Sequence, residues 1–381
     1  MILGIILMTT KNIKKFAIPF NTLKSTFDLK IINKVTKSVF KSGSFILGNY
    51  VKEFEQKLAK RFNFNFCVGV ASGTDAITLA LKACGVGPKD WVLTVANSAP
   101  ATVAAIANTG ANILFCDVDT NGLMDCKEAL DIIKNRREIK AVVPVHLYGR
   151  VCDISLLTND KNSDGHNKVM VIEDAAQAAG SESKKYKIGS RSEAVCYSFY
   201  PTKNLGCYGD GGAICTNAEY IRNRLQSLRN YGIGAGKLIY EYGYNSRLDE
   251  LQAAYLIERL KILNHINLWK SSIAEAYCSA FRRIRGLHVP NYDRLCNYHL
   301  FPIFTDKWRE LIYDFINGGI EFARHYPIAA YDQPIERMAR HLRLKNTDWL
   351  TENVITLPNY YGMPYEYVRH VISTVRRFFD A

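Results

Sequence analysis

This 381-residue sequence lacks the patterns that usually accompany nucleic-acid binding. It contains no block of basic residues, no aromatic signature of RNA-binding domains and no zinc-finger spacing. The formal net charge is nevertheless +13, and the 49 Lys and Arg residues are spread along the whole chain. Such a charge attracts anions in general, and phosphorylated small molecules account for it as well as a polynucleotide does. We therefore expect no nucleic-acid partner.

Long hydrophobic runs and paired cysteine motifs are also missing. The apolar N-terminal run MILGIILM is too short to span a bilayer, and its basic residues come after it rather than before it. The ten cysteines include no C-x-x-C pair, and most of them lie within apolar runs, which is typical of free thiols in a core. We expect a cytoplasmic protein with no membrane partner and no bound metal, in which residues 1–17 form a leader.

What the sequence does contain is an alternation of two periodicities. Short apolar runs that are typical of strands alternate with stretches of helical periodicity from residue 51 onward. Continuous apolar strands that alternate with helices indicate a parallel sheet covered on both faces. In such a sheet, ligands bind at the carboxyl ends of the strands. The predicted strands are residues 66–70, 91–95, 113–119, 141–147 and 169–175.

The pattern changes after residue 262. One helical stretch covers residues 249–262, a second covers residues 263–284, and shorter mixed elements follow up to a last helix at 365–379. A chain of this length exceeds one ordinary core. We predict a large domain over residues 18–262 and a smaller domain over residues 263–381.

Two charged residues stand directly after apolar runs. Lys203 stands just after the largely apolar run at 194–199, and Asp174 comes after the four apolar residues 169–172 and Glu173. Taken singly, Lys203 is typical of a solvated surface lysine, and Asp174 is equally typical of a helix N-cap. Together they suit a pyridoxal phosphate (PLP) site, where a lysine carries the cofactor as a Schiff base and an acid keeps the pyridine nitrogen protonated.

A phosphate-binding element is predicted nearby. Ser72, Gly73 and Thr74 begin a helix directly after a strand, and Ser198 places another hydroxyl near Lys203. Backbone N–H groups and hydroxyls at a helix start bind phosphate, although the same residues also form ordinary helix caps. We expect Gly73, Thr74 and Ser198 to hold the cofactor phosphate.

Six stretches resemble successive signatures of the sugar aminotransferases of the DegT/DnrJ/StrS family. They are SGTDAITLALKACGVGPKD, PVHLYG, VIEDAAQAAG, YSFYPTKNLGCYGDGGAICTN, RNYG and GYNSRLDELQAA. The match runs in order from residue 18 to the last predicted helix. The resemblance implies a PLP-dependent aminotransferase of fold type I, the aspartate aminotransferase-like α/β fold. That fold has a mostly parallel seven-stranded sheet in the large domain and a smaller α+β C-terminal domain.

The resemblance also assigns roles. Lys203 would carry the cofactor and transfer the proton, and Asp174 would pair with the pyridinium. Gln177 would contact the side of the ring that bears the phenolic oxygen, although alone it resembles a helix-surface amide. Asn245 would reach the phosphate in the neighbouring subunit of a homodimer with shared active sites, although alone it resembles a turn residue. Relatives with histidine in place of the lysine act as dehydratases, so Lys203 favours transamination.

The substrate predictions come from the same resemblance. The sequence is most similar to the subgroup that transfers an amino group from L-glutamate to a dTDP-3-keto-6-deoxyhexose, for a surface glycan such as lipopolysaccharide. His325, Tyr326 and Tyr200 would contact the sugar, and Lys237 would meet the diphosphate from across the interface. A packed histidine at 325 and a mobile-loop lysine at 237 are the alternatives.

Two alternative functions remain open, and the sequence differs from the family pattern in two places. The substrate could instead be a 4-keto UDP- or GDP-sugar, or the chain could be a noncatalytic regulator built on the PLP fold. Many relatives have an aromatic residue that stacks on the cofactor ring where this chain has Ala99. The family often has proline and histidine where Ala329 and Tyr331 stand, which affects the sugar-side contacts.

Overall fold

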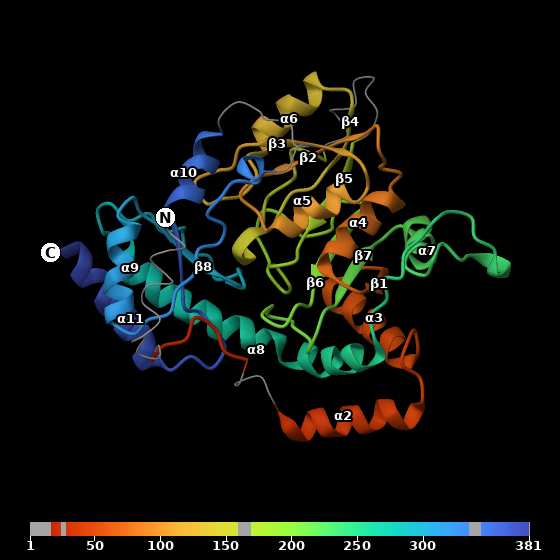
Figure 1. Ribbon diagram of the computed structural model, residues 1–381, viewed down its shortest axis with the longest axis horizontal. Helices are drawn as coiled ribbons and strands as arrows, with labels where there is room; N and C mark the ends of the chain where they lie inside the picture. Colours follow the sequence, from red (N-terminus) through yellow and green to blue (C-terminus); the bar gives the residue numbers. More distant parts are fainter. Residues whose placement is uncertain (1–16, 24–27, 159–168, 335–343, 381) are drawn as a thin grey trace.

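The computed structural model describes residues 17–23, 28–158, 169–334 and 344–380. Its main body is built on a seven-stranded sheet with the strand order β1-β7-β6-β5-β4-β2-β3 (Figure 1). β7 pairs antiparallel with both of its neighbours, and the other pairs are parallel. The mostly parallel seven-stranded sheet is therefore confirmed. The strands are β1 Phe66–Val70, β2 Trp91–Val95, β3 Asn112–Cys116, β4 Ile139–Val142, β5 Met170–Asp174, β6 Ala194–Ser198 and β7 Gly212–Thr216.

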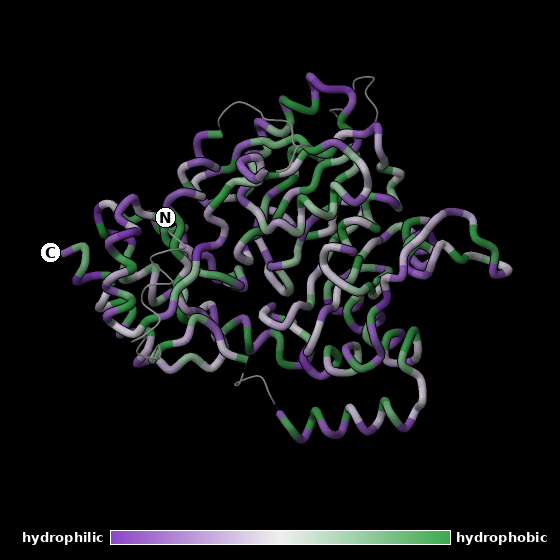
Figure 2. The backbone as a smooth tube through the Cα atoms, viewed as in Figure 1, coloured by the Kyte–Doolittle hydropathy of each residue, from purple (hydrophilic) through white to green (hydrophobic). Residues whose placement is uncertain are grey.

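Helices cover both faces of this sheet. On one face, α4 (Gly73–Ala83), α5 (Pro100–Ala107) and α7 (Glu219–Leu228) share a core with alternate strand residues. On the other face, α3 (Asn49–Phe62) and the first part of α8 (Glu250–Phe281) pack on the intervening residues. α6 (Cys126–Asn135) packs against β3, and α2 (Leu29–Ser42) lies outside the sheet against α8. Figure 2 shows that the central strands are largely hydrophobic.

α8 is one continuous helix of 32 residues. The prediction of two helical stretches that meet at residue 262 is wrong in this respect. No proline or glycine interrupts residues 250–281, and buried residues such as Leu263 and Ile266 continue the packed face through the expected break. The domain boundary at 262 falls inside this helix and stays a prediction, as does the leader, of which only Ala17 lies within the described residues.

The C-terminal part is a smaller α+β arrangement. β8 (Phe301–Phe304) and β9 (Val354–Leu357) form a two-stranded antiparallel sheet. α9 (Trp308–Asn317), α11 (Tyr365–Asp380) and the second part of α8 share an aromatic-rich core with it. α10 (Lys345–Asn353) leads directly into β9. The predicted small α+β unit is confirmed.

The described residues also bear on the expectations about cysteines, membranes and metals. All ten cysteines are free thiols, and nine of them are buried. None of the helices in the described part of the chain is both long and apolar enough to cross a bilayer. Among the same residues, no group of three or more His, Cys, Asp or Glu side chains could hold a metal ion.

The sheet brings three strand ends together. Asp174, the last residue of β5, pairs with Cys196 of β6 in parallel register. Because β7 runs in the opposite direction, its first residue, Gly212, pairs with both Ser198 of β6 and Val70 of β1. The carboxyl ends of β1, β5 and β6 therefore meet at one edge of the sheet, where a ligand site is expected.

Candidate active site

A cavity of about 500 Å3 lies at this edge. Most of the predicted site residues line it: Gly73, Thr74, Asp174, Gln177, Ser198, Tyr200, Lys203, His325 and Tyr326. They come from segments that are far apart in the sequence, so the fold itself assembles the site. Two of the predicted residues, Lys237 and Asn245, do not line the cavity of their own chain.

Asp174 presents a buried carboxylate to the cavity. It is 4% exposed, its Oδ2 accepts a hydrogen bond from Thr102 Oγ1 at 2.8 Å, and its Oδ1 accepts one from the N–H of Ala176 at 3.0 Å. Burial raises the pKa of Asp174, whereas these two hydrogen bonds and the charge of Lys203 lower it. The donors therefore favour the ionised carboxylate, whereas burial disfavours it.

The alternative role of Asp174 as a helix N-cap is wrong. The residues that follow it form turns instead of a helix. Asn297 Nδ2 donates hydrogen bonds to the carbonyl oxygens of Gln177 and Ala179, and Gly180 has a φ of +76°. These contacts direct the segment away from a helical path.

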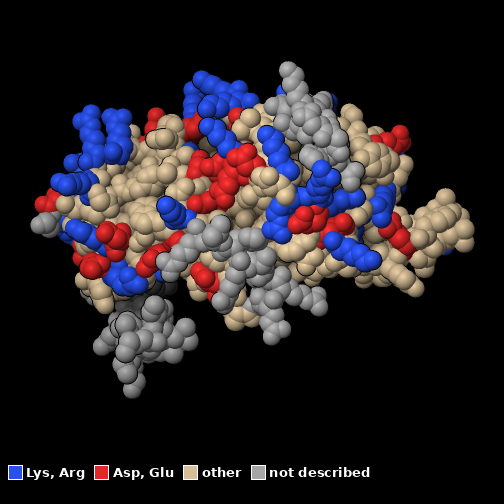
Figure 3. Space-filling model, turned by 90° about the horizontal axis from the view of Figure 1, so that it is seen from above, with Lys and Arg blue, Asp and Glu red and all other residues tan. Residues whose placement is uncertain are grey.

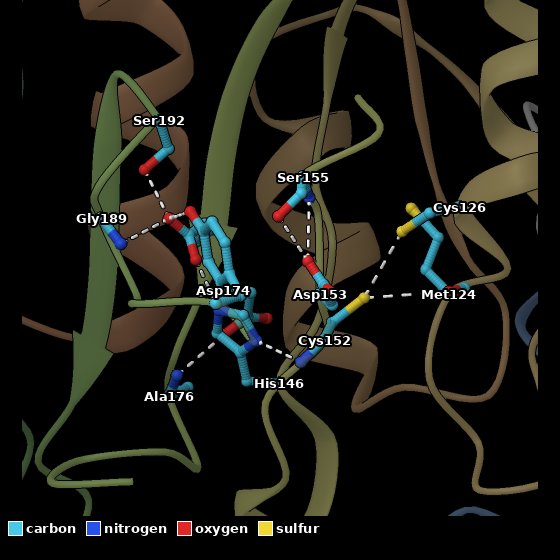
Figure 4. A network of polar contacts seen from close by, with 12 residues as sticks. Met124, Cys126, His146, Cys152, Asp153, Ser155, Asp174, Ala176, Gly189 and Ser192 are labelled. Atoms are coloured by element: carbon cyan, nitrogen blue, oxygen red, sulfur yellow. Dashed lines mark hydrogen bonds and ion pairs between the residues drawn. The ribbon is translucent and has the colours of Figure 1, made fainter. Parts of the chain in front are cut away.

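A second polar network lies behind Asp174 (Figure 4). The carboxylate of Glu173 is fully buried and pairs with His146 Nε2 at 2.7 Å, while Ser192, Tyr186 and the N–H of Gly189 also donate to it. The N–H of Cys152 donates to His146 Nδ1, so the proton on the imidazole is on Nε2. The N–H of His146 in turn donates to the carbonyl of Asp174 at 2.9 Å. The network thus holds the end of β5 rigidly.

Lys203 lies in a closed loop directly after β6. Its N–H donates to the carbonyl oxygen of Tyr200 at 2.8 Å, and the N–H of Cys207 donates to that of Phe199 at 2.8 Å. A Cβ at Gly206 would lie 2.5 Å from the Pro201 oxygen, so this turn requires glycine. Burial lowers the pKa of the Lys203 amine to about 8, although the charge of Asp174 raises it. An amine with this pKa is partly uncharged near neutral pH.

The start of α4 forms another part of the cavity wall. Ser72 caps this helix by accepting the N–H of Asp75 at 3.0 Å. A Cβ at Gly73 would lie 2.6 Å from Ser198 Cβ, and one at Gly212 would lie 2.2 Å from the Ser72 oxygen. Only glycine lets the helix start approach the ends of β6 and β7 this closely, and this approach brings Ser198 beside the first turn of α4.

Gln177 forms part of the cavity wall. It is 5% exposed, its Oε1 accepts the N–H of Tyr148 at 2.7 Å, and its Nε2 donates to the Tyr326 hydroxyl at 3.0 Å. The alternative of a helix-surface amide is therefore wrong. Tyr148 also donates to the carbonyl oxygen of His325 at 2.6 Å, so the wall joins the large sheet to the C-terminal part. A role of Gln177 toward the cofactor ring stays a prediction.

His325 is both packed and open to the cavity. Its ring stacks on Phe20, with centroids 5.5 Å apart, and its Nδ1 lies 3.1 Å from Thr356 Oγ1. Burial and the charge of Lys203 lower the pKa of His325 to about 4, so the ring is neutral near pH 7. Tyr200, which is 52% exposed, also lines the cavity.

Several residues that line the cavity were not predicted from the sequence, and Thr102, His299 and Phe20 are three of them. Thr102 binds Asp174 from 72 positions away, and nothing in the sequence around it distinguishes it from any helical threonine. His299 lines the cavity with a buried Nδ1 that has no hydrogen-bond partner among the described residues. Phe20 comes from the N-terminal segment, which Ile18 fastens to Ile320 by a β-bridge.

Lys237 and Asn245 lie in the segment that follows α7 and projects from the body of the molecule (Figure 1). Both residues are exposed. Asn245 forms a β-bridge with Asn230, and Lys237 has a φ of +64° within a short 3-10 turn. Large apolar side chains of this segment are also exposed, among them Leu238, Ile239 and Tyr242.

The cavity fits the PLP that the sequence resemblance implies. A buried carboxylate, an amine with a lowered pKa and a glycine-lined helix start face one space of sufficient volume. The carboxylate of Asp174 can pair with a protonated pyridine nitrogen, and the amine of Lys203 can react with an aldehyde carbon. The start of α4 and the hydroxyl of Ser198 can donate hydrogen bonds to a phosphate.

Comparisons with known proteins agree with this fit. Residues 28–376 match the model of the DegT/DnrJ/EryC1/StrS aminotransferase family. The chain is 36% identical over 360 residues to the dTDP-3-amino-3,4,6-trideoxy-alpha-D-glucose transaminase of Micromonospora megalomicea subsp. nigra, which covers 91% of this chain and 94% of that one. It is 35% identical over 355 residues to the dTDP-3-amino-3,6-dideoxy-alpha-D-galactopyranose transaminase of Aneurinibacillus thermoaerophilus, with 92% and 95% covered.

The fold has an equally clear counterpart. The crystal structure of S. venezuelae DesV in complex with a ketimine intermediate superposes with a TM-score of 0.90 at 32% identity, over 96% of this chain and 99% of that chain. The family match spans most of the sequence, and it agrees with the cavity at the strand ends. The chain therefore belongs to the DegT/DnrJ/EryC1/StrS aminotransferase family and is a PLP-dependent sugar aminotransferase.

Proposed function

We propose that this enzyme transfers an amino group from L-glutamate to a dTDP-linked 3-keto-6-deoxyhexose, in the cytoplasm and for a surface glycan. The observation that carries the proposal is the convergence of Lys203, Asp174 and the start of α4 on one cavity. Both relatives described above are named as transaminases of dTDP-3-amino sugars. Their similarity supports the same nucleotide and the same carbon position here.

The proposed roles follow from the chemistry of each side chain. When bound, PLP supplies a conjugated ring that withdraws electrons from the bonds next to the amino group. Asp174 holds a positive charge on the pyridine nitrogen through its ionised carboxylate. Lys203, once its amine is free and uncharged, would be the base that accepts the proton from the amino-bearing carbon of the donor and the acid that gives the proton up again. Ser198 and the first turn of α4 bind the phosphate.

The walls of the cavity would orient the sugar. Tyr326 is held by Gln177, and His325 is held between Phe20 and Thr356, so both side chains have few alternative rotamers. Since the His325 ring is neutral near pH 7, it can donate and accept one hydrogen bond each. We assign these two residues and Tyr200 to sugar binding.

An amination screen tests the substrate. The protein is incubated with 15N-labelled L-glutamate and with matched 3-keto and 4-keto sugars linked to dTDP, UDP or GDP, and the products are detected by mass. We expect the label in the dTDP-3-amino sugar, with the UDP and GDP compounds slower by at least about tenfold. Efficient amination of a 4-keto UDP- or GDP-sugar without 3-keto activity would replace this substrate by the alternative.

A noncatalytic regulator is the remaining alternative. On the face seen in Figure 3, Lys and Arg side chains are interspersed with Asp and Glu side chains. A mixed surface of this kind is a poor platform for a polynucleotide backbone. Salt-sensitive DNA binding without any amination in the screen would favour the regulator.

We also propose a homodimer in which each subunit completes the active site of the other. Of the described residues that line the cavity, Lys203 is the only lysine or arginine, and it is committed to the cofactor carbonyl. A phosphate and a sugar diphosphate need further donors. The projecting segment supplies an exposed lysine, Lys237, and an exposed amide, Asn245, beside apolar side chains suited to an interface.

Mixing two inactive variants tests this arrangement. Lys203→Ala removes the amine, and Asn245→Asp places a negative charge against the phosphate. If the sites are shared, a mixed dimer has one site with both lesions and one site with neither. Random reassortment makes about half of the dimers mixed, so about a quarter of all sites regain glutamate-dependent amination.

The control is each variant unfolded and refolded alone, which stays inactive. If Asn245 serves its own subunit, every site in the mixture keeps one lesion and no activity returns. Absence of recovery in a preparation that sediments as a dimer would therefore remove the shared-site arrangement.

A further inference from the structure

Asp75 is an unexpected residue in a helix turn that binds phosphate. α4 begins at Gly73, so Asp75 is the third residue of this helix. The N–H groups of the first turn would hold the cofactor phosphate, whereas a carboxylate repels a phosphate by like charge. Ser72, Gly73 and Thr74 line the cavity, but Asp75 does not. Its carboxylate therefore lies outside the space proposed for the phosphate, and its hydrogen-bond partner indicates its role.

The partner of Asp75 is the hydroxyl of Ser246. Ser246 is 1% exposed, and its Oγ donates a hydrogen bond to Asp75 Oδ2 at 2.6 Å and accepts one from the N–H of Ala71 at 3.1 Å. Ala71 directly precedes Ser72, whose Oγ accepts the N–H of Asp75 at 3.0 Å. Two hydrogen bonds thus fasten a side chain from 171 positions away to the segment that begins α4.

Ser246 directly follows Asn245, the residue proposed to reach the cofactor phosphate of the other subunit. The backbone of both residues pairs with the residues that follow α7. The N–H of Ser246 donates to the carbonyl oxygen of Arg229 at 3.0 Å, and Asn245 forms a β-bridge with Asn230. Successive side chains of an extended segment point to opposite sides. Accordingly, Ser246 is buried against its own α4, whereas Asn245 is exposed.

We propose that Asp75 is a positioning residue that acts, through the hydroxyl of Ser246, on the place of Asn245 in the active site of the partner subunit. Without this hydrogen bond fewer contacts hold the segment, and the Asn245 side chain has more positions available to it. The inference rests on the proposed shared active site. It assigns the effect of Asp75 to the cofactor site of the other subunit instead of its own.

A local role in its own helix is the alternative. An acid in the first turn of a helix stabilises that helix through the positive end of its dipole. Such a role would lower the melting temperature of a variant and would act within one subunit. Glu310 is the third residue of α9 and is exposed, so Glu310→Ala removes an acid from the matching helical position far from the cavity residues in sequence.

Heterodimers separate the two roles because they allow one site to be measured alone. Two chains with different affinity tags are produced together, and one of them carries Lys203→Ala, so PLP can be attached in one site only. Titration with PLP, followed by the absorbance of PLP attached to Lys203, gives the Kd of that site. Asp75→Ala is then placed either on the chain with Lys203→Ala or on the chain with the intact Lys203.

The two placements have different expected results. On the chain with Lys203→Ala, whose Asn245 would serve the intact site, we expect Asp75→Ala to weaken PLP binding about tenfold. On the chain with the intact Lys203 we expect no loss, because α4 keeps its N–H groups and loses only a charge that repels phosphate. Asp75→Asn keeps an acceptor for the Ser246 hydroxyl and should retain the wild-type Kd in both placements. Glu310→Ala should change the Kd in neither.

Ser246→Ala tests the link itself. It should weaken PLP binding in the same placement as Asp75→Ala, and the double variant should lose no more than either single one, because a single hydrogen bond carries both effects. Fully additive losses would overturn the proposal. So would a loss that appears with Asp75→Ala on the chain with the intact Lys203, or an unchanged Kd in both placements.

Asn245→Asp in the same two placements keeps this test apart from that of the shared site. If Asn245→Asp weakens PLP binding only on the chain with the intact Lys203, the shared-site arrangement itself fails. If it acts from the chain with Lys203→Ala while Asp75→Ala does not, the shared site stands and the role of Asp75 is refuted.

Discussion

Lys203→Ala is expected to abolish the amination of the ketosugar, with a loss of at least about a thousandfold. The variant removes the amine that holds the cofactor carbonyl and the base that transfers the proton, and the wall of the cavity offers no other lysine among the described residues. Both half-reactions should be affected equally, because each needs the proton transfer. Single-turnover absorbance measurements with L-glutamate and with the ketosugar check this.

The control is Lys184→Ala, which changes an exposed lysine outside the cavity and should keep full activity. Added methylamine is small enough to enter a cavity of about 500 Å3 and should restore part of the proton transfer to Lys203→Ala. Wild-type rates in the alanine variant would show that another group is the base.

Asp174→Asn is expected to slow both half-reactions by about a hundredfold to a thousandfold while the protein stays folded. Asparagine has the same shape, and its side chain can still accept the N–H of Ala176 and donate to the hydroxyl of Thr102. A neutral amide, however, cannot hold a positive charge on the pyridine nitrogen. Equilibrium dialysis should show that the cofactor still binds, and single-turnover kinetics should show the loss.

Asp153→Asn provides the comparison for Asp174→Asn. Asp153 is an exposed acid outside the cavity that accepts hydrogen bonds from Ser155, and its replacement should change neither rate. Near-normal turnover in Asp174→Asn would mean that the buried carboxylate has a structural role alone.

Most of the sheet could be predicted from the sequence because its strands are short and continuously apolar, but β7 was not among the predicted strands. β1 and β2 are bounded by polar or glycine-containing turns. Because both faces of these strands are buried, their apolar residues are continuous and do not follow the period of an amphipathic helix. The strand-end positions of Lys203 and Asp174 followed from the same pattern. The continuity of α8 could not be predicted, because its two ends pack in different cores: Leu263 lies in the core beside the large sheet, and Ile273 lies in the C-terminal core.

The details of the site depend on contacts between remote residues. The segment after Asp174 has a helical composition, yet hydrogen bonds from Asn297, more than a hundred residues away, hold it in turns. Thr102 acquires its role only through a partner on another element. Local propensity carries no information about such pairs, so they are found only in the folded chain.

The central claim is that Lys203 carries the cofactor, and one measurement tests it most directly. Purified protein loaded with PLP is treated with sodium borohydride, which reduces an imine to a stable secondary amine, and is then digested and mapped by mass spectrometry. We predict that the added pyridoxyl phosphate mass lies on the peptide that contains Lys203, and that Lys203→Ala takes up no label. Label on a different lysine, or none on the loaded protein, would contradict the account.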